Sequence, residues 1–183
     1  VAADLLSQAE HGPDSQVILV SDSEKIIDET FTELYKQLDV LPRKDIAISA
    51  LQHSKAIIVK SLNEAVELSN AYAPEHLILA VKQPNKLLPL IINAGSVFLG
   101  NYSSESAGDY ASGTNHCLPT NGFARSYSGV SVDSFQKKIS FQKISRQGLK
   151  NMGPAIELMA EAEGLMAHKN AVSIRLKTIG NKK

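Results

Sequence analysis

The sequence predicts an α/β protein: a Rossmann-like layered sheet followed by a small, mainly helical carboxyl-terminal tail. Short apolar runs alternate with amphipathic helical patterns up to Gly100, and this alternation predicts the sheet. After Gly100 the composition changes, which marks the end of the layered part. A length of 183 residues with 43% hydrophobic residues suits about one domain with a real core. We expect the sheet domain to cover 1–130 and the tail 131–183.

The first predicted element is a helix that has no start signal. Ala2, Leu5, Leu6 and Ala9 recur at helical spacing, and no capping residue precedes them. The Gly-Pro pair at 12–13 should end this helix. We therefore expect the chain to begin inside a helix, with the amino-terminal part of the sheet domain missing.

Strands and helices are then expected to alternate. The apolar runs predict buried strands over 17–20, 46–51, 56–59, 76–81 and 96–99. Amphipathic spacing predicts helices over about 24–38, 61–72 and 84–94. The Ser-Asp-Ser run before the first of these and Ser61 before the second supply caps, and Gly95 closes the third. Such a sheet binds ligands at the carboxyl ends of its strands.

The second part of the sequence opens with a long connection. Residues 100–129 are rich in Gly, Ser, Asn and Thr and far exceed a usual connection of roughly 4–6 residues, which indicates a functional loop. A short strand near 138–144, helical stretches over about 145–164 and 165–176, and a frayed end over 179–183 are expected to follow. The segment from Ser131 onward is too small to build its own core, so it should pack on another surface, such as a partner subunit.

Charge and cysteine content narrow the function classes. Nineteen basic and nineteen acidic residues give no net charge, and no apolar run approaches a membrane span. We therefore expect neither nucleic acid nor membrane as a partner, and a small neutral substrate fits better. Cys117 is the only cysteine, and the chain does not open with a leader-like apolar region. These features predict a cytoplasmic protein.

Several scattered residues are of types that hold divalent metals. Gln8 and His11 lie three apart, so on a helix they would project from one face. Imidazole suits zinc, whereas an amide oxygen is a weaker ligand. Asp109 lies in a Gly-rich stretch where backbone can approach a ligand. Each of these residues has an ordinary alternative: Gln8 and His11 could be a polar helix end, and Asp109 an aspartate in a turn. His168 could equally be a histidine on a helix surface. Asp4 is interpreted as plain helix surface.

The adjacent pair Glu75 and His76 is a stronger candidate for proton transfer. Pro74 should end the preceding helix and place both groups where an apolar strand begins. A histidine there can accept a hydroxyl proton near neutral pH, and a neighbouring glutamate can draw a proton from water. The alternative is a capping or ion-paired glutamate beside a satisfied core histidine.

Five stretches together resemble the histidinol dehydrogenase family. They read ADLLSQAEHGPDSQVIL at 3–19, NAYAPEHL at 70–77, AGSVFLG at 94–100, GDYASGTNHCLPT at 108–120 and AEAEGLMAH at 160–168. The resemblance covers nearly the whole chain and is confined to the carboxyl-terminal part of family members. It implies NAD-dependent oxidation of L-histidinol to L-histidine through L-histidinal, by two hydride transfers that finish histidine biosynthesis.

The resemblance also implies roles for individual residues. Zinc, one ion in each active site, would be held by Gln8, His11, Asp109 and, from the other subunit of a homodimer, His168. Glu75 would activate water, and His76 would act as the base. The implied substrate-binding residues are Gln8, His11, His76, Asp109, His116, Glu163 and His168. Residues 1–130 would then carry most of the active site, and the tail would cross to the partner subunit.

The chain lacks a Gly-x-Gly-x-x-Gly signature for a dinucleotide. No NAD-contacting residue is therefore assigned to it, and we expect the isolated fragment to be inactive. Two alternatives belong to other classes. A zinc hydrolase would use the same ligands and turn over without NAD, and a non-catalytic α/β scaffold would only dimerise through its tail.

Overall fold

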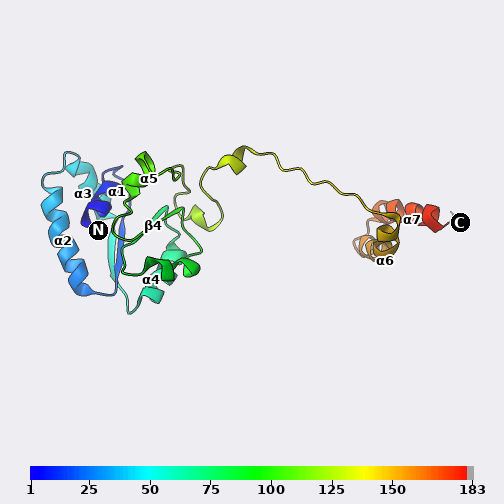
Figure 1. Cartoon of the computed structure of the whole chain (residues 1–183), viewed down its shortest axis with the longest axis horizontal. Coiled ribbons are helices and arrows are strands. Elements are labelled where there is room, and N and C mark those ends of the chain that lie inside the picture. Colours follow the sequence, from blue (N-terminus) through cyan, green and yellow to red (C-terminus); the bar gives the residue numbers. More distant parts are fainter. Residues whose placement is uncertain (181–183) are drawn as a thin grey trace. The chain divides into compact units, whose positions relative to one another are not determined.

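The computed structural model describes residues 1–180 and divides into two compact units, Val1–Gln136 and Lys137–Lys183 (Figure 1). The first unit combines helices with short parallel strands, so the α/β class is confirmed. The Rossmann-like arrangement and the boundary expected between residues 130 and 131 stay predictions. No helix within 1–180 is both long and apolar enough to span a membrane.

The first unit contains two small sheets rather than one larger sheet. Its helices are α1 (Ala2–Ala9), α2 (Glu24–Leu38), α3 (Lys44–Gln52), α4 (Leu62–Tyr72) and α5 (Glu105–Tyr110). Its strands are β1 (Ile18–Ser21), β2 (Lys55–Ile58), β3 (His76–Leu79) and β4 (Ser96–Leu99). β1 pairs with β2 and β3 with β4, both in parallel. The predicted caps are confirmed, because the Ser23 and Ser61 side chains accept hydrogen bonds from backbone amides in the first turns of α2 and α4.

Helix packing supplies most of the core of this unit. α1 packs against α2 and α3, and the buried residues of this cluster are Ala2, Leu6, Ala9, Val17, Leu34, Leu38, Ala47 and Ala50. The apolar face predicted for α1 is thus confirmed, with Leu5 packed at its edge. A second, smaller cluster joins Val66 of α4 to Leu79 of β3. Four-residue strands bury little area themselves, so the helices hold the sheets in place.

Three sequence-based expectations about local structure are wrong. Residues 46–51, expected as a strand, lie in α3, where Ala47 and Ala50 bury one helical face; a short apolar run fits either structure, and alanine favours the helix. Residues 84–94 form two 3₁₀ turns, Pro84–Lys86 and Leu88–Leu90, since Pro89 cannot donate a helical hydrogen bond. Residues 138–144 form no strand and are exposed.

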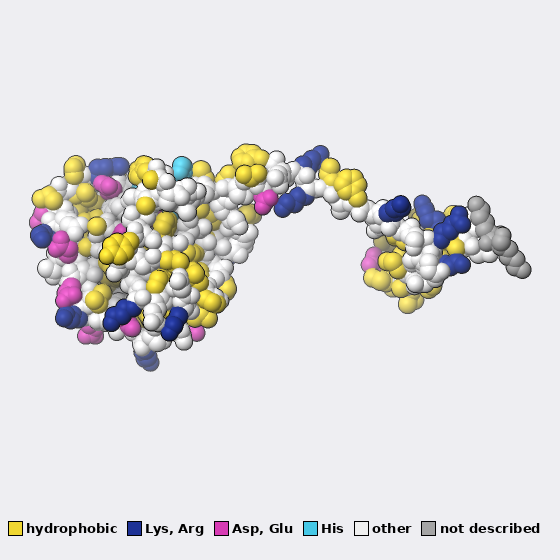
Figure 2. Space-filling model, viewed as in Figure 1, with side chains coloured by type: hydrophobic (Ala, Val, Ile, Leu, Met, Phe, Trp, Pro, Cys, Tyr) yellow, Lys and Arg dark blue, Asp and Glu magenta, His cyan; other side chains and the backbone are white. Residues whose placement is uncertain are grey.

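The long connection after Gly100 is also more ordered than expected. It contains α5 and a 3₁₀ turn, Phe123–Arg125. Ser104 caps α5 by accepting a hydrogen bond from the Ala107 amide. A later 3₁₀ turn, Val132–Phe135, precedes an extended stretch whose apolar side chains face solvent (Figure 2).

The second unit contains two helices that pack on each other. α6 (Arg146–Ala162) and α7 (Met166–Gly180) agree closely with the predicted helical stretches, although α7 runs past the expected end at 176. A Cβ at Gly153 would lie 2.7 Å from a Leu176 methyl carbon, so a larger residue there would require the Leu176 side chain to shift. Of the expected frayed end, residues 179 and 180 are helical and 181–183 lie outside the described residues. Several apolar side chains on α6 and α7 remain exposed, among them Leu158, Met159 and Met166.

Gly95→Ala tests how tightly β3 and β4 are joined. A Cβ at residue 95 would lie 2.6 Å from the Glu75 carbonyl oxygen, which accepts a hydrogen bond from the Ser96 amide at 2.8 Å. Because the clash is with backbone, we expect a loss of about 1–3 kcal/mol in the free energy of unfolding, measured by urea titration. Gly180→Ala, where the new methyl meets open space, should change it by less than about 0.5 kcal/mol. Equal stability of the two variants would contradict this tight junction.

Candidate active site

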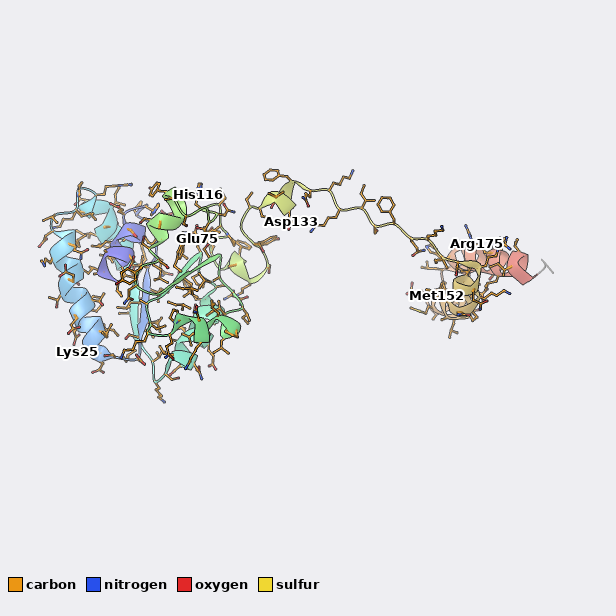
Figure 3. The ribbon with its side chains drawn as sticks, in the orientation of Figure 1. Lys25, Glu75, His116, Asp133, Met152 and Arg175 are labelled. Atoms are coloured by element: carbon orange, nitrogen blue, oxygen red, sulfur yellow. The ribbon has the colours of Figure 1, made fainter. Side chains whose placement is uncertain are left out.

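The Glu75–His76 pair lies where the sequence places it, at the start of β3 (Figure 3). α4 ends at Ala73, whose left-handed backbone (φ 58°) turns the chain toward Pro74 and the strand. Both side chains of the pair are half-buried. The His76 ring lies 6.0 Å from that of Phe98 on β4, which limits its freedom on one side.

α5 brings two carboxyl groups to the same place. Glu105 and Asp109 are one helical turn apart, so their side chains share a face. Ligand atoms of His76, Glu105 and Asp109 all lie within 4.8 Å of one another. Glu105 is buried, with 3% of its surface exposed. The cluster therefore joins one imidazole to two carboxyl groups from separate elements.

α1 adds Gln8 to this cluster. The Gln8 amide lies close enough to the Glu105 carboxyl to act on its pKa. Its Nε2 atom is buried and has no hydrogen-bond partner among the described residues. His11 is exposed just past the end of α1, so the expected shared helical face with Gln8 is wrong. It is nevertheless near enough to affect the pKa of His76.

The cluster changes the acidity of two of its members. Burial raises the pKa of Glu105 to about 7; the neighbouring Asp109 and the charge of Glu75 add to this rise, and the Gln8 amide opposes it. Burial lowers the pKa of His76, against the charges of Glu75 and Asp109, while His11 adds to the lowering. His76 is therefore neutral at neutral pH, as a proton acceptor must be.

The other candidates lie elsewhere. His116 is exposed in the loop after α5 (Figure 3). Glu163 is the residue that ends α6, and His168 lies in α7; both are exposed in the second unit. Asp4 lies in the first turn of α1 and is partly exposed.

Glu105 is the residue that the sequence analysis missed. The composition of residues 100–129 predicts a long loop, so no helix carrying carboxylates is expected there. The available signal was a serine at 104 as a cap, followed by carboxylates at i and i+4 on the same helical face.

The donor set suits a divalent cation. Imidazole and carboxylate oxygen are zinc ligands, and an amide oxygen can join them. The buried Glu105 Oε1 atom accepts no hydrogen bond from the described residues, so it is an acceptor that a cation or a donor group would satisfy. The residues therefore fit the group that the sequence resemblance implies.

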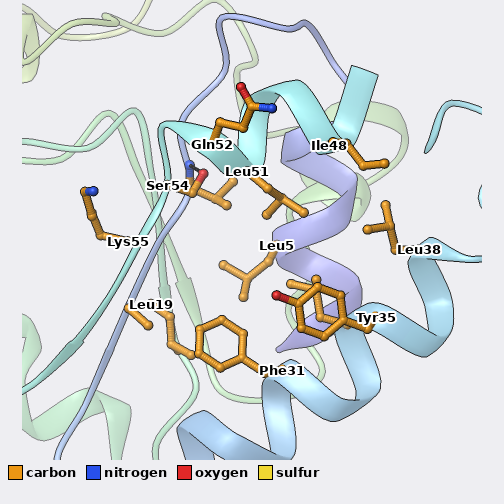
Figure 4. A pocket seen from close by; sticks show the side chains of 13 residues that line it. Leu5, Leu19, Phe31, Tyr35, Leu38, Ile48, Leu51, Gln52, Ser54 and Lys55 are labelled. Atoms are coloured by element: carbon orange, nitrogen blue, oxygen red, sulfur yellow. Dashed lines mark hydrogen bonds between the residues drawn. The ribbon is translucent and has the colours of Figure 1, made fainter. Parts of the chain in front are cut away.

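An apolar hollow lies away from this cluster. It has a volume of about 420 Å³ and opens between α1, α2, α3 and the β1–β2 sheet (Figure 4). Phe31, Tyr35 and Ile48 line it, and none of the candidate catalytic or metal residues does. The polar cluster and this hollow are therefore lined by different residues.

Comparison with known proteins identifies the family. The model of the family described as histidinol dehydrogenase matches residues 1–176. The chain belongs to the histidinol dehydrogenase family. The family resemblance found in the sequence is thus confirmed.

Similar proteins support the same assignment. Histidinol dehydrogenase from Bacteroides thetaiotaomicron is 60% identical over 98% of this chain and 42% of its own length. A bifunctional histidine biosynthesis protein from Photorhabdus laumondii is 55% identical over 96% of this chain and 22% of its own. The crystal structure of histidinol dehydrogenase from Elizabethkingia anophelis has a TM-score of 0.91 and 60% identity, covering 98% of this chain and 42% of that one. This chain thus spans about 42% of the length of these single-function histidinol dehydrogenases.

Proposed function

We propose that this chain carries part of the active site of a zinc- and NAD-dependent histidinol dehydrogenase, which oxidises L-histidinol to L-histidine through L-histidinal in the last steps of histidine biosynthesis. Membership of the histidinol dehydrogenase family supports the reaction. The observation that carries the proposal is the convergence of Gln8, Glu75, His76 and Asp109 from three separate elements into one cluster.

His76 is the proposed base of both oxidation steps. A neutral imidazole nitrogen takes the proton of the substrate hydroxyl as hydride leaves the same carbon. NAD, when bound, accepts that hydride. In the second step, the Glu75 carboxylate takes a proton from water as the water oxygen adds to the aldehyde carbon, and His76 returns the proton gained in the first step to the aldehyde oxygen. The resulting hydrate loses its hydride to a second NAD, and its hydroxyl proton passes to His76, which is neutral again.

Zinc is the proposed metal of this site, where it would polarise and orient the substrate oxygen. Gln8, His11 and Asp109 would hold it together with His168 of the partner subunit. The proposed substrate-binding residues are these four with His76, His116 and Glu163. The exposed apolar side chains of α6 and α7 support a homodimer in which this second unit packs on a partner. L-Histidinol is the only other proposed partner, and we propose that neither nucleic acid nor membrane is bound. A cytoplasmic location stays a prediction.

An activity assay tests the proposal. We compare this chain with an extended protein, defined as this sequence together with the additional length found in its relatives, using L-histidinol with and without NAD. We expect NADH and histidine from the extended protein only. NAD-independent hydrolysis would favour a zinc hydrolase. Inactivity of both proteins, with the extended one folded and loaded with zinc, would favour a non-catalytic dimerising scaffold.

Zinc should bind this chain weakly. One proposed ligand comes from a partner, and His11 is exposed rather than held in the cluster. We expect dialysis against a chelator to remove the metal, as measured by metal analysis of the purified chain. The extended protein treated in the same way serves as the comparison. One zinc per chain that survives the chelator would contradict this expectation.

A further inference from the structure

The amide of Gln8 can help or hinder a cation, depending on which end faces it. The oxygen is a ligand, whereas the NH₂ group carries two donor hydrogens that a cation repels. The two ends exchange places by rotation about the last side-chain torsion. A residue that binds the nitrogen would therefore fix the oxygen toward the metal.

Glu105 offers the acceptor that this orientation needs. Gln8 Nε2 and Glu105 Oε1 are two of the three buried side-chain atoms without a hydrogen-bond partner in the described residues. One is a donor and the other an acceptor. The two side chains are near neighbours, because the Gln8 amide acts directly on the Glu105 carboxyl. Leaving both atoms unpaired would cost about 1–3 kcal/mol each, so a small side-chain rotation that joins them is favoured.

α5 holds Glu105 firmly in this position. Ser104 fixes the start of the helix by capping it. Gly108 lies against the Phe98 ring so closely that a Cβ there would be 2.9 Å from a ring carbon. The helix therefore packs closely on β4. Only 3% of the Glu105 surface is exposed, so few water molecules can reach its carboxyl group and hydrogen-bond to it.

We propose that Glu105 is a positioning residue for the metal site: its carboxyl accepts a hydrogen bond from Gln8 Nε2 and leaves Gln8 Oε1 to face the cation. The inference deepens the proposed zinc site and rests on that proposed function. Glu105 as a direct ligand is the competing assignment. It would leave Gln8 Nε2 without an acceptor among the described residues.

Nuclear magnetic resonance of the 183-residue chain tests the hydrogen bond itself. The Gln8 side-chain NH₂ signals are assigned by their loss in Gln8→Leu. We expect one proton to be shifted downfield and protected from exchange in the wild-type chain and in Glu105→Gln, whose amide oxygen still accepts. Glu105→Met, which fills similar volume without an acceptor, should abolish both effects. Unprotected Gln8 protons in the folded wild-type chain would overturn the proposal, whatever the variants do.

Titration with Co²⁺ alone tests the consequence for the metal, since bound Co²⁺ absorbs visibly even when it binds weakly. Glu105→Met should bind about 10–100-fold more weakly, as is typical when support of a ligand is lost. Glu105→Gln should keep nearly the wild-type affinity and absorption. Loss of affinity with a changed absorption in Glu105→Gln would instead identify Glu105 as a ligand and overturn the proposal.

A double-mutant cycle separates positioning from general damage. If Glu105 acts through Gln8, adding Glu105→Met to Gln8→Leu should weaken Co²⁺ binding no further. Additive losses would contradict the proposal. An absence of Co²⁺ binding by the wild-type chain would also overturn it. Failure of the extended protein to oxidise histidinol, with the hydrogen bond and Co²⁺ binding intact, would contradict the proposed reaction alone.

Discussion

Replacing His76 by asparagine in the extended protein is expected to slow both oxidation steps by roughly 10²–10⁴-fold, the usual loss for a general base. Each step removes a hydroxyl proton, and asparagine cannot accept it. The rates are measured separately with L-histidinol and with L-histidinal as substrate. His53→Asn, an exposed histidine at the end of α3, is the matched control and should leave both rates unchanged.

The companion change Glu75→Gln should separate the two steps. Only the aldehyde step consumes a water molecule, so its rate should fall far more than the rate of alcohol oxidation. Gln keeps the size of the side chain and the Glu75 backbone contacts to the start of β4. Equal losses in both steps would refute the division of labour between Glu75 and His76.

The second large effect concerns the proposed sharing of the active site between two subunits. His11→Ala and His168→Ala subunits of the extended protein should each be inactive alone, because each lacks one proposed zinc ligand. Mixing them should restore activity, because one site of every heterodimer then has both histidines. With random pairing, half the dimers are mixed and half their sites are complete, so about a quarter of wild-type activity is expected in a steady-state assay.

A second mixture controls for rescue by other means. His11→Ala and Asp109→Ala both alter the ligands that one chain supplies, so every site in their heterodimer remains damaged and no rescue is expected. Heterodimer formation is verified by differently tagged subunits. Absence of rescue in the first mixture, with heterodimers present, would mean that each site is built within a single chain.

Helices with a serine cap in front of a regular apolar pattern could be predicted from the sequence, as could one short apolar strand. Ser23 and the spacing that follows it located α2 to the residue, and the apolar run 96–99 located β4. The strand expected at 46–51 was wrong because period alone does not distinguish a short apolar run in a strand from one in a buried helix. The helix is favoured because it buries Ala47 and Ala50 in the core cluster with α1, which is a tertiary contact.

The site was predictable only where neighbouring residues carry its chemistry. Glu75 and His76 are adjacent in sequence and lie together where a strand was expected to begin. Their meeting with Gln8 and Asp109 depends on how α1, β3 and α5 pack, which no local pattern records. For Glu105, the Ser104 cap and the i, i+4 carboxylates indicate a helical face, but its burial beside other acids is a tertiary property that they do not predict.

The pairing of the strands has a consequence for how the protein behaves in concentrated solution. Within residues 1–180, each strand has one hydrogen-bonded neighbour, so every strand is also an edge strand. Such edges present unpaired backbone amides and carbonyls that can pair with an extended segment of another protein molecule. Their four-residue length, and the cover given by nearby helices, are what limit that exposure. We therefore expect that lengthening β1 or β3 in this chain would raise the risk of intermolecular sheet growth.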